Sequence, residues 1–254
     1  MKDTNRKEQP PDSTMSLGDH LEELRWRLIL AIIGLAVGTI ICLIFGRQIL
    51  GFIQGPYTQL QQNHPELPKL KYWSPPDAFT AYMKISLLSG LIISSPWVFY
   101  HIWMFIAAGL YPNEKRYIHF AAPFSAALFI AGALFFLYIV APISLEFFRR
   151  FGEFIDVEPM WTLQKYVSFI TILMLVFGIG FQTPIAIFIL NKTELVSLKT
   201  LRRSRKYVLL GVFVVAATAT PPDVVSQIAL AVPLYLLFEL GILLSHFAGR
   251  KKTS

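Results

Sequence analysis

The sequence has few charged residues and almost no cysteine. Charged residues make up 15% of the 254-residue chain, against roughly 25% in an ordinary soluble domain, while hydrophobic residues make up 54%. The single cysteine, Cys42, excludes an intramolecular disulfide and a cysteine-based metal site. No G-x-S-x-G, H-E-x-x-H or P-loop motif occurs, and the five histidines share no helical ligand spacing. We therefore predict a protein that is not soluble, is not an enzyme, and binds no metal or cofactor.

Long stretches without Asp, Glu, Lys or Arg run through the chain. They cover residues 28–46, 85–113, 117–145, 166–191, 207–222 and 224–238. The first four have 19 to 29 residues, enough to cross a core of ~30 Å at ~1.5 Å per helical residue. We predict an all-α integral membrane protein with six transmembrane helices, curved by kinks at internal prolines.

The fifth and sixth predicted helices are short for a bilayer. Residues 207–220 precede a Pro-Pro break, and the sixth stretch meets Glu239 after only 15 residues. Two interpretations are open. Either flanking polar residues reach the interface and the helices continue, or the membrane is thinner beside them.

Lys and Arg are distributed unevenly between the predicted loops. Sixteen of the 23 fall in the N-terminal region, the second and fourth loops and the C-terminal tail, and five fall in the first and third loops. Because cytoplasmic loops are rich in Lys and Arg, we predict that both termini are cytoplasmic. The net charge of +7 then needs no nucleic-acid partner. We expect a disordered cytoplasmic tail over 1–15, one membrane domain over 16–249 and a basic tail over 250–254.

An amphipathic segment precedes the first predicted span. Ser16 and Asp19 have the S-x-x-D form of a capping box, which predicts the start of a helix. Glu23 and Arg27 stand four residues apart, where a surface ion pair is worth only ~0.3–0.5 kcal/mol. The acids of this segment fit either an ordinary interfacial helix or a cytoplasmic surface that binds a basic ligand.

The second cytoplasmic loop is unusually apolar and contains one acid. Glu114 follows the aromatic residues Trp103, Phe105 and Tyr111. Either it balances the two basic residues that come next, or the carboxylate and the aromatic rings bind a cation with apolar neighbours.

Polar residues inside the spans need partners because hydrocarbon offers none. Gln182 is expected to bond either to the carbonyl freed by Pro184 or to another helix, with the local bond the more frequent outcome. Asp223 is expected to cap the sixth helix. The alternative function is a proton-coupled small-solute transporter that uses Asp223, Glu239 and Gln182. We find no internal repeat in the sequence, which disfavours it.

Four motifs resemble those of the TatC family, the receptor subunit of the twin-arginine protein translocase. They follow the family order and cover nearly the whole chain. They are HLEELRWRL at 20–28, against H-L-x-E-L-R-x-R-L; Phe105-Ile106, Leu110-Tyr111 and Glu114, against F-I-x-P-A-L-Y-x-x-E; FGIGFQTP at 177–184, against F-G-x-x-F-E-x-P; and Thr220-Pro221-Pro222-Asp223 with Ser226-Gln227, against T-P-P-D-x-x-S-Q.

The resemblance implies a non-enzymatic receptor in the bacterial cytoplasmic (inner) membrane. Such a protein binds twin-arginine signal peptides of folded cargo at its cytoplasmic face. With A-type and B-type single-span subunits it exports the cargo by using the proton-motive force. Self-association in the complex and contact with membrane lipid are also implied.

The resemblance also assigns roles to residues by position. Signal-peptide binding is implied for Glu23, Leu24, Arg25, Phe105, Tyr111 and Glu114. Contact with a partner helix inside the membrane is implied for Phe181 and Gln182, and a role at the periplasmic face for Pro56, Pro221 and Asp223.

The sequence departs from the family pattern at two sites. Ala108 and Gly109 replace Pro and Ala in the loop motif, which predicts a less rigid loop. Gln182 replaces the intramembrane Glu. An amide can still donate and accept a hydrogen bond, but it does not titrate, which argues against a proton-carrying role there.

Overall fold

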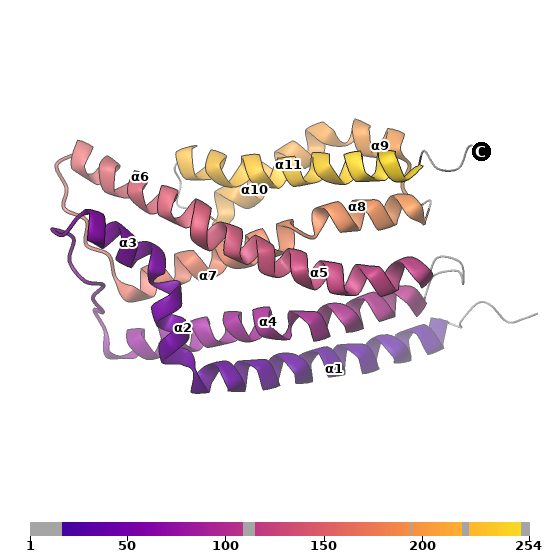
Figure 1. Cartoon of the computed structure of the whole chain (residues 1–254), viewed down its shortest axis with the longest axis horizontal. Coiled ribbons are helices and arrows are strands. Elements are labelled where there is room, and N and C mark those ends of the chain that lie inside the picture. Colours follow the sequence, from indigo (N-terminus) through magenta and orange to yellow (C-terminus); the bar gives the residue numbers. More distant parts are fainter. Residues whose placement is uncertain (1–16, 109–114, 194, 220–223, 250–254) are drawn as a thin grey trace, which may run out of the picture.

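The computed structural model describes residues 17–108, 115–193, 195–219 and 224–249, and these residues are almost entirely helical (Figure 1). The predicted tails, 1–15 and 250–254, lie outside the described residues. In order, the elements are α1 (Leu17–Ile44), α2 (Gly46–Ile53), α3 (Gly55–Asn63), α4 (Pro75–Ala108), α5 (Lys115–Phe135), the π-helical segment η1 (Phe136–Val140), α6 (Ala141–Phe154), α7 (Leu163–Gly180), α8 (Thr183–Lys192), α9 (Leu198–Arg203), α10 (Arg205–Ala219) and α11 (Val224–Gly249).

The long helices lie side by side, with α1 at one edge and α10 and α11 at the other (Figure 1). The start of α1, the end of α4 and the end of α11 share one end of the molecule, which we call the terminal end. The short helices α2 and α3 and the end of α6 form the opposite end, which we call the cap end. The described parts of both chain termini therefore lie on the same side, as the predicted topology requires.

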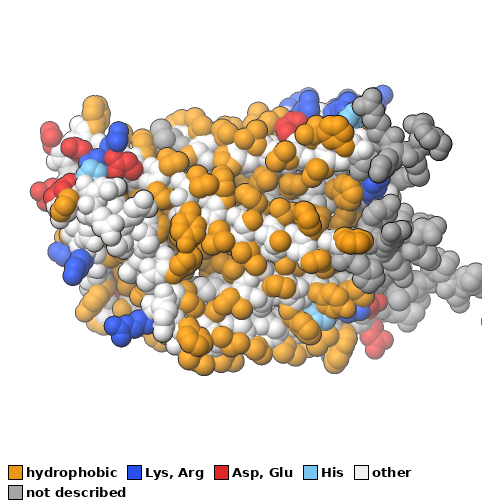
Figure 2. Space-filling model, viewed as in Figure 1, with side chains coloured by type: hydrophobic (Ala, Val, Ile, Leu, Met, Phe, Trp, Pro, Cys, Tyr) orange, Lys and Arg blue, Asp and Glu red, His pale blue; other side chains and the backbone are white. Residues whose placement is uncertain are grey.

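Hydrophobic side chains cover the middle of the molecule and charged side chains gather toward its two ends (Figure 2). Five helical stretches are long and apolar enough to cross a membrane: Leu21–Ile44, Pro75–Ala107, Phe120–Phe154, Leu163–Lys192 and Gln227–Phe247. These features confirm the prediction of an all-α, multi-pass membrane protein.

The last two helices differ from each other, although both were predicted to be short. The described part of α10 agrees with this prediction, since its 15 residues extend about 22 Å. The prediction is wrong for α11, which continues for 26 residues, about 39 Å. Glu239 does not end this helix because Arg205 and Tyr235 bind its carboxylate, with distances of 2.7 and 3.0 Å.

Prolines bend the bundle at the places where helix hydrogen bonds are lost. Pro142 follows the π-helical segment η1, which adjusts the backbone where the missing N–H of proline frees a carbonyl. Pro184 follows the break between α7 and α8, so the fourth predicted span consists of two helices. The expected curved bundle results.

The main core lies between α4, α5, η1, α7 and the cap. Its largest fully buried side chains include Phe136, Phe177, Ile170 and Leu173. By contrast, only 11% of the apolar window of α1 is buried, against 44% in each of the other four spans. Helix α1 is therefore attached to the outside of the core, with much of its surface open.

The cap end is held by contacts between segments far apart in the sequence. The Tyr166 hydroxyl on α7 donates to the carbonyl of Ile53 at 2.7 Å, and the Tyr57 hydroxyl donates to the carbonyl of Pro68. Backbone bonds also join Lys71 to the segment that precedes α7. These bonds fix α2 and α3 over the end of the bundle.

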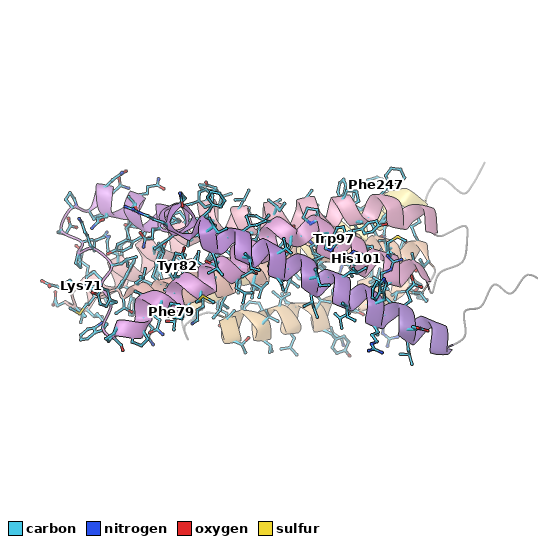
Figure 3. The ribbon with its side chains drawn as sticks, turned by 90° about the horizontal axis from the view of Figure 1, so that it is seen from below. Lys71, Phe79, Tyr82, Trp97, His101 and Phe247 are labelled. Carbon is cyan, nitrogen blue, oxygen red and sulfur yellow. The ribbon has the colours of Figure 1, made fainter. Side chains whose placement is uncertain are left out.

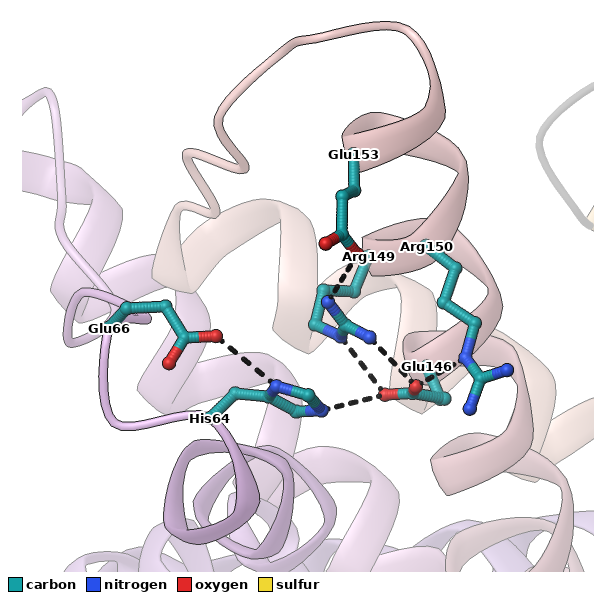
Figure 4. A network of polar contacts seen from close by, with 6 residues as sticks. All are labelled: His64, Glu66, Glu146, Arg149, Arg150 and Glu153. Atoms are coloured by element: carbon teal, nitrogen blue, oxygen red, sulfur yellow. Dashed lines mark hydrogen bonds and ion pairs between the residues drawn. The ribbon is translucent and has the colours of Figure 1, made fainter.

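A charged network joins the cap to α6 (Figure 4). Glu146 binds Arg149 at 3.0 Å and Arg150 at 2.6 Å, and His64, just after α3, lies 3.5 Å from it. The uninterrupted stretch Phe120–Phe154 has 35 residues, about 52 Å, which exceeds a ~30 Å core. Its last turns, from Glu146 onward, therefore project beyond the membrane. Hydrogen bonds from Arg149 and then Arg150 lower the pKa of Glu146 to about 2.

Candidate functional site at the terminal end

Small residues bring α1 close against α4. A Cβ atom on Gly90 would lie 2.6 Å from the Cα atom of Thr39, and one on Gly38 would lie 2.8 Å from the carbonyl oxygen of Gly90. The backbones of the two helices are thus in near contact, which only glycine allows. This close approach holds α1 although little of its surface is buried.

Aromatic side chains of α4 set the position of α1 along this contact (Figure 3). The Trp97 indole N–H donates to the carbonyl of Leu30 at 2.9 Å, and Tyr82 donates to the carbonyl of Leu43. Glu23 lies seven residues before Leu30, and Phe105 lies eight after Trp97. Because the helices are antiparallel, Glu23 and Phe105 lie at similar levels, about 10–12 Å farther toward the terminal end.

Glu23 forms an ion pair within its own helix. Its Oε1 lies 3.1 Å from a guanidinium nitrogen of Arg27, and the two side chains are 24% and 22% exposed. An accessible groove of about 470 Å³ adjoins this carboxylate, and its described lining consists of Glu22, Glu23, Arg25, Trp26 and Ile29. The sequence predicted the ion pair and the acidic face, and the structure places both beside an open groove.

His101 is a residue of this end that the sequence reasoning missed. It lies one helical turn beyond Trp97 on α4, with the two rings 4.6 Å apart. Its side chain is buried, and neither ring nitrogen has a hydrogen-bond partner among the described residues. In the sequence, His101 is visible only as a histidine four residues after a tryptophan in an apolar span. This spacing does not show which groups surround the imidazole ring.

The other predicted binding residues are divided between described and undescribed parts of the chain. Leu24 is 36% exposed on α1, and Phe105 is partly buried in the last turn of α4. Tyr111 and Glu114 lie outside the described residues, as do Pro221 and Asp223. The structure therefore brings Glu23, Leu24, Arg25 and Phe105 to one end of the molecule.

Gln182, between α7 and α8, is linked by hydrogen bonds to α5 and through it to α4. Its side-chain amide donates to the carbonyl of Ser125 on α5 at 2.9 Å, and the Ser125 hydroxyl accepts a 2.7 Å bond from the indole of Trp103 on α4. Of the two expected partners, the structure shows the one on another helix, and the local bond that was held to be the more frequent outcome is not the one observed. The amide oxygen, Oε1, is buried and has no hydrogen-bond partner among the described residues.

Two further predicted residues take part in packing. Phe181, beside Gln182, packs against Phe135 with ring centres 5.5 Å apart and ring planes tilted by 45°, and lies against Gly132. Pro56 is buried at the start of α3, where its missing N–H costs nothing. Among the described residues, no group of three or more His, Cys, Asp and Glu is arranged to hold a metal ion.

Comparison with known proteins decides the family. The model of the family described as Sec-independent protein translocase protein (TatC) matches residues 19–233. The chain belongs to the TatC family. A TatC of Carboxydothermus hydrogenoformans is 36% identical over 244 residues, 96% of this chain and 98% of the relative. A TatC of Aquifex aeolicus is 37% identical over 239 residues, 94% and 98% of the two chains.

The fold agrees with a solved TatC. A crystal structure of a twin-arginine translocase receptor TatC superposes with a TM-score of 0.81 at 36% identity and covers 91% of this chain and 100% of that one. Ala108, which stands where the family motif has proline, is helical and belongs to α4. Gly109 lies outside the described residues.

Proposed function

We propose that this chain is the receptor core of a twin-arginine translocase and binds the paired arginines of signal peptides at its terminal end. The observation that carries the proposal is the setting of Glu23. Its carboxylate borders an open groove, and its ion-pair partner, Arg27, belongs to the same helix and holds it in a pair worth only ~0.3–0.5 kcal/mol. An incoming guanidinium replaces this partner at little cost.

The chemistry of arginine fits this setting. A guanidinium binds a carboxylate with two parallel hydrogen bonds and keeps its charge at every physiological pH, whereas a lysine ammonium is a point charge. Two acids, Glu23 and Glu114, receive the two arginines. Trp26, which is 62% exposed beside Glu23, offers a flat ring for a guanidinium or for the apolar residues of the peptide.

The proposed orientation places the terminal end in the cytoplasm of a bacterium, with the chain in the inner membrane. The excess of Lys and Arg in the loops of this end supports it. The cap end then faces the periplasm, where we assign roles to Pro56, Pro221 and Asp223. Cargo passes the membrane together with A-type and B-type single-span subunits and the proton-motive force, and the receptor performs no covalent chemistry.

We also propose that Gln182 contacts a single-span partner helix inside the membrane. Its buried Oε1 has no hydrogen-bond partner in the described part of the chain, and an unpaired acceptor in hydrocarbon is costly. A hydroxyl or amide of a partner helix removes this cost. Since Gln does not titrate, the contact is a hydrogen bond and carries no proton.

Crosslinking tests the proposal directly. A signal peptide that carries a photoreactive group next to its Arg-Arg pair is irradiated with the detergent-purified chain, and the peptide with Lys-Lys serves as comparison. We expect strong labelling by the first and weak labelling by the second. In the Glu23→Ala and Glu114→Ala variants, the Arg-Arg peptide should label no more strongly than the Lys-Lys peptide.

The matched control is Glu66→Ala, which removes an exposed carboxylate at the cap end. It should label like the unchanged chain. Equal labelling by both peptides, or undiminished labelling of the Glu23→Ala/Glu114→Ala chain, contradicts the proposal.

A further inference from the structure

A second groove, of about 410 Å³, lies between α1, α4 and α7 toward the cap end. Most of its lining is aliphatic and comes from all three helices, including Leu35, Leu87, Leu91 and Leu175. The groove opens on the surface where α1 leaves the core uncovered. Because the groove is apolar and lies on the outer surface of the membrane-spanning helices, we expect it to face the acyl chains of one leaflet.

The groove also contains a lysine. The Nζ atom of Lys84 on α4 lies 2.9 Å from the Ser168 hydroxyl on α7, and its side chain is exposed. Lys84 forms no ion pair with a described carboxylate. A cation in an apolar membrane environment is costly unless it reaches an anion or water, and the serine hydroxyl supplies no negative charge.

A second lysine stands one turn nearer the cap end. Lys165 precedes Ser168 by three residues on α7 and lines a neighbouring pocket together with Trp73 and Trp161. Tryptophan is enriched at the membrane–water interface. Lys165 has no ion pair within the described residues. The acid of this pocket, Asp77, accepts hydrogen bonds from two backbone N–H groups at the start of α4.

The order of these features along the helices matches one leaflet of a bilayer. Lys84 lies nine residues inside α4, about 14 Å from its start, and Leu91 lies about 10 Å deeper. On α7, Lys165 comes first, then Ser168, and then Leu175. Both walls of the groove therefore change from basic to apolar in the same direction.

We propose that this groove binds an anionic phospholipid of the cap-end leaflet, with its phosphate at Lys84 and Lys165 and an acyl chain along Leu87, Leu91 and Leu175. An ammonium has three donors, and the Ser168 hydroxyl occupies one at Lys84, so two remain for phosphate oxygens. Lysine binds phosphate as a point charge. A zwitterionic lipid brings its own cation toward two lysines and binds less well.

Native mass spectrometry tests the site. The detergent-purified chain is mixed with phosphatidylglycerol or phosphatidylcholine, and the lipid-bound fraction is measured. We expect the unchanged chain to retain phosphatidylglycerol preferentially. The Lys84→Gln/Lys165→Gln chain should bind it about tenfold to thirtyfold more weakly, at about 1 kcal/mol per basic residue. Lys84→Arg should keep the preference.

Two further variants separate the site from general charge effects. Arg47→Gln/Lys69→Gln removes the same charge from the cap end without touching the groove, and should bind phosphatidylglycerol like the unchanged chain. Leu91→Trp fills the apolar part, keeps both lysines, and should reduce binding. Equal retention of the two lipids by the unchanged chain overturns the proposal, as does undiminished binding by either groove variant. Circular dichroism confirms that each variant is folded.

Discussion

The carboxylates of Glu146, at the cap end, and Glu23, at the terminal end, are held in different ways. At the cap end, polar side chains bind partners far away in the sequence, as Tyr166 does with Ile53 and His64 with Glu146. At the terminal end, Arg27, one turn away on the same helix, is the only described ion-pair partner of the Glu23 carboxylate. The cap end uses its polar groups for structure, while the terminal end leaves a carboxylate accessible to a ligand.

The attachment of α1 makes this difference possible. Helix α1 carries the acidic groove, and it is held through glycine contacts and two aromatic hydrogen bonds to α4 while most of its surface stays open. One side of α1 is held rigidly against α4, and its other side is open. This arrangement fixes the place of Glu23 without covering its carboxylate.

The largest effect is expected when α1 is pushed away from α4. In Gly90→Ala the new Cβ meets the backbone of Thr39 at 2.6 Å, which cannot move cheaply, so we expect a loss of about 1–3 kcal/mol or more and weaker peptide binding. Gly211→Ala, which meets nothing within 4 Å in the interior of α10, is the control and should be stabilised by up to about 1 kcal/mol, because alanine favours helix over glycine. Thermal unfolding in detergent measures both, and equal melting temperatures refute the role of the glycine contact.

A somewhat smaller effect is expected from the cap. Tyr166→Phe leaves the carbonyl of Ile53 without its donor. We expect this loss to lower stability by on the order of 1–2 kcal/mol. Tyr72→Phe removes the hydroxyl of a tyrosine that is 65% exposed and should be nearly neutral. Peptide binding should be unchanged in both, since neither lies at the terminal end. Loss of binding in Tyr166→Phe would show that the ends are coupled.

The charged network predicts a pH dependence of the cap. Because the pKa of Glu146 is lowered to about 2, from about 4.3 in an unfolded chain, its ion pairs contribute fully above pH 4.3 and are lost as the pH falls from there toward 2. The melting temperature of Glu146→Gln should be below that of the unchanged chain at pH 6. The difference should shrink below pH 4. A difference that grows on acidification contradicts this assignment.

The smallest effect on stability is expected at Glu23. Glu23→Gln removes one partly exposed pair within a helix and should cost only about 0.3–0.5 kcal/mol. Denaturant titration in detergent measures it. A cost as large as that of Tyr166→Phe would mean that Glu23 has a structural role, and the contrast between the two ends would fail.

Composition and charge patterns predicted the architecture well, for a physical reason. In hydrocarbon every backbone group must be satisfied within the segment, so long apolar stretches can only be helices. The prediction failed for α11, where Glu239 was taken as the end of the apolar stretch. The acid is tolerated because Arg205, on another helix, pairs with it, and a pairing between helices cannot be read from one segment.

The candidate site was predicted in part. Glu23 and Arg27 were placed correctly, because their spacing of four residues fixes their contact on a helix. The partner of Gln182 and the burial of His101 were not predicted, since both depend on how α4, α5 and α7 pack together. The roles assigned to Glu114 and Asp223 stay predictions.

The most direct test of the account is the affinity of an Arg-Arg signal peptide for two variants compared with the unchanged chain. Glu23→Gln and Glu146→Gln each remove one carboxylate, at opposite ends. We predict that Glu23→Gln binds the peptide at least about tenfold more weakly, about 1.4 kcal/mol, and that Glu146→Gln binds it with unchanged affinity. Unchanged affinity in Glu23→Gln, or an equal loss in both variants, would contradict the account.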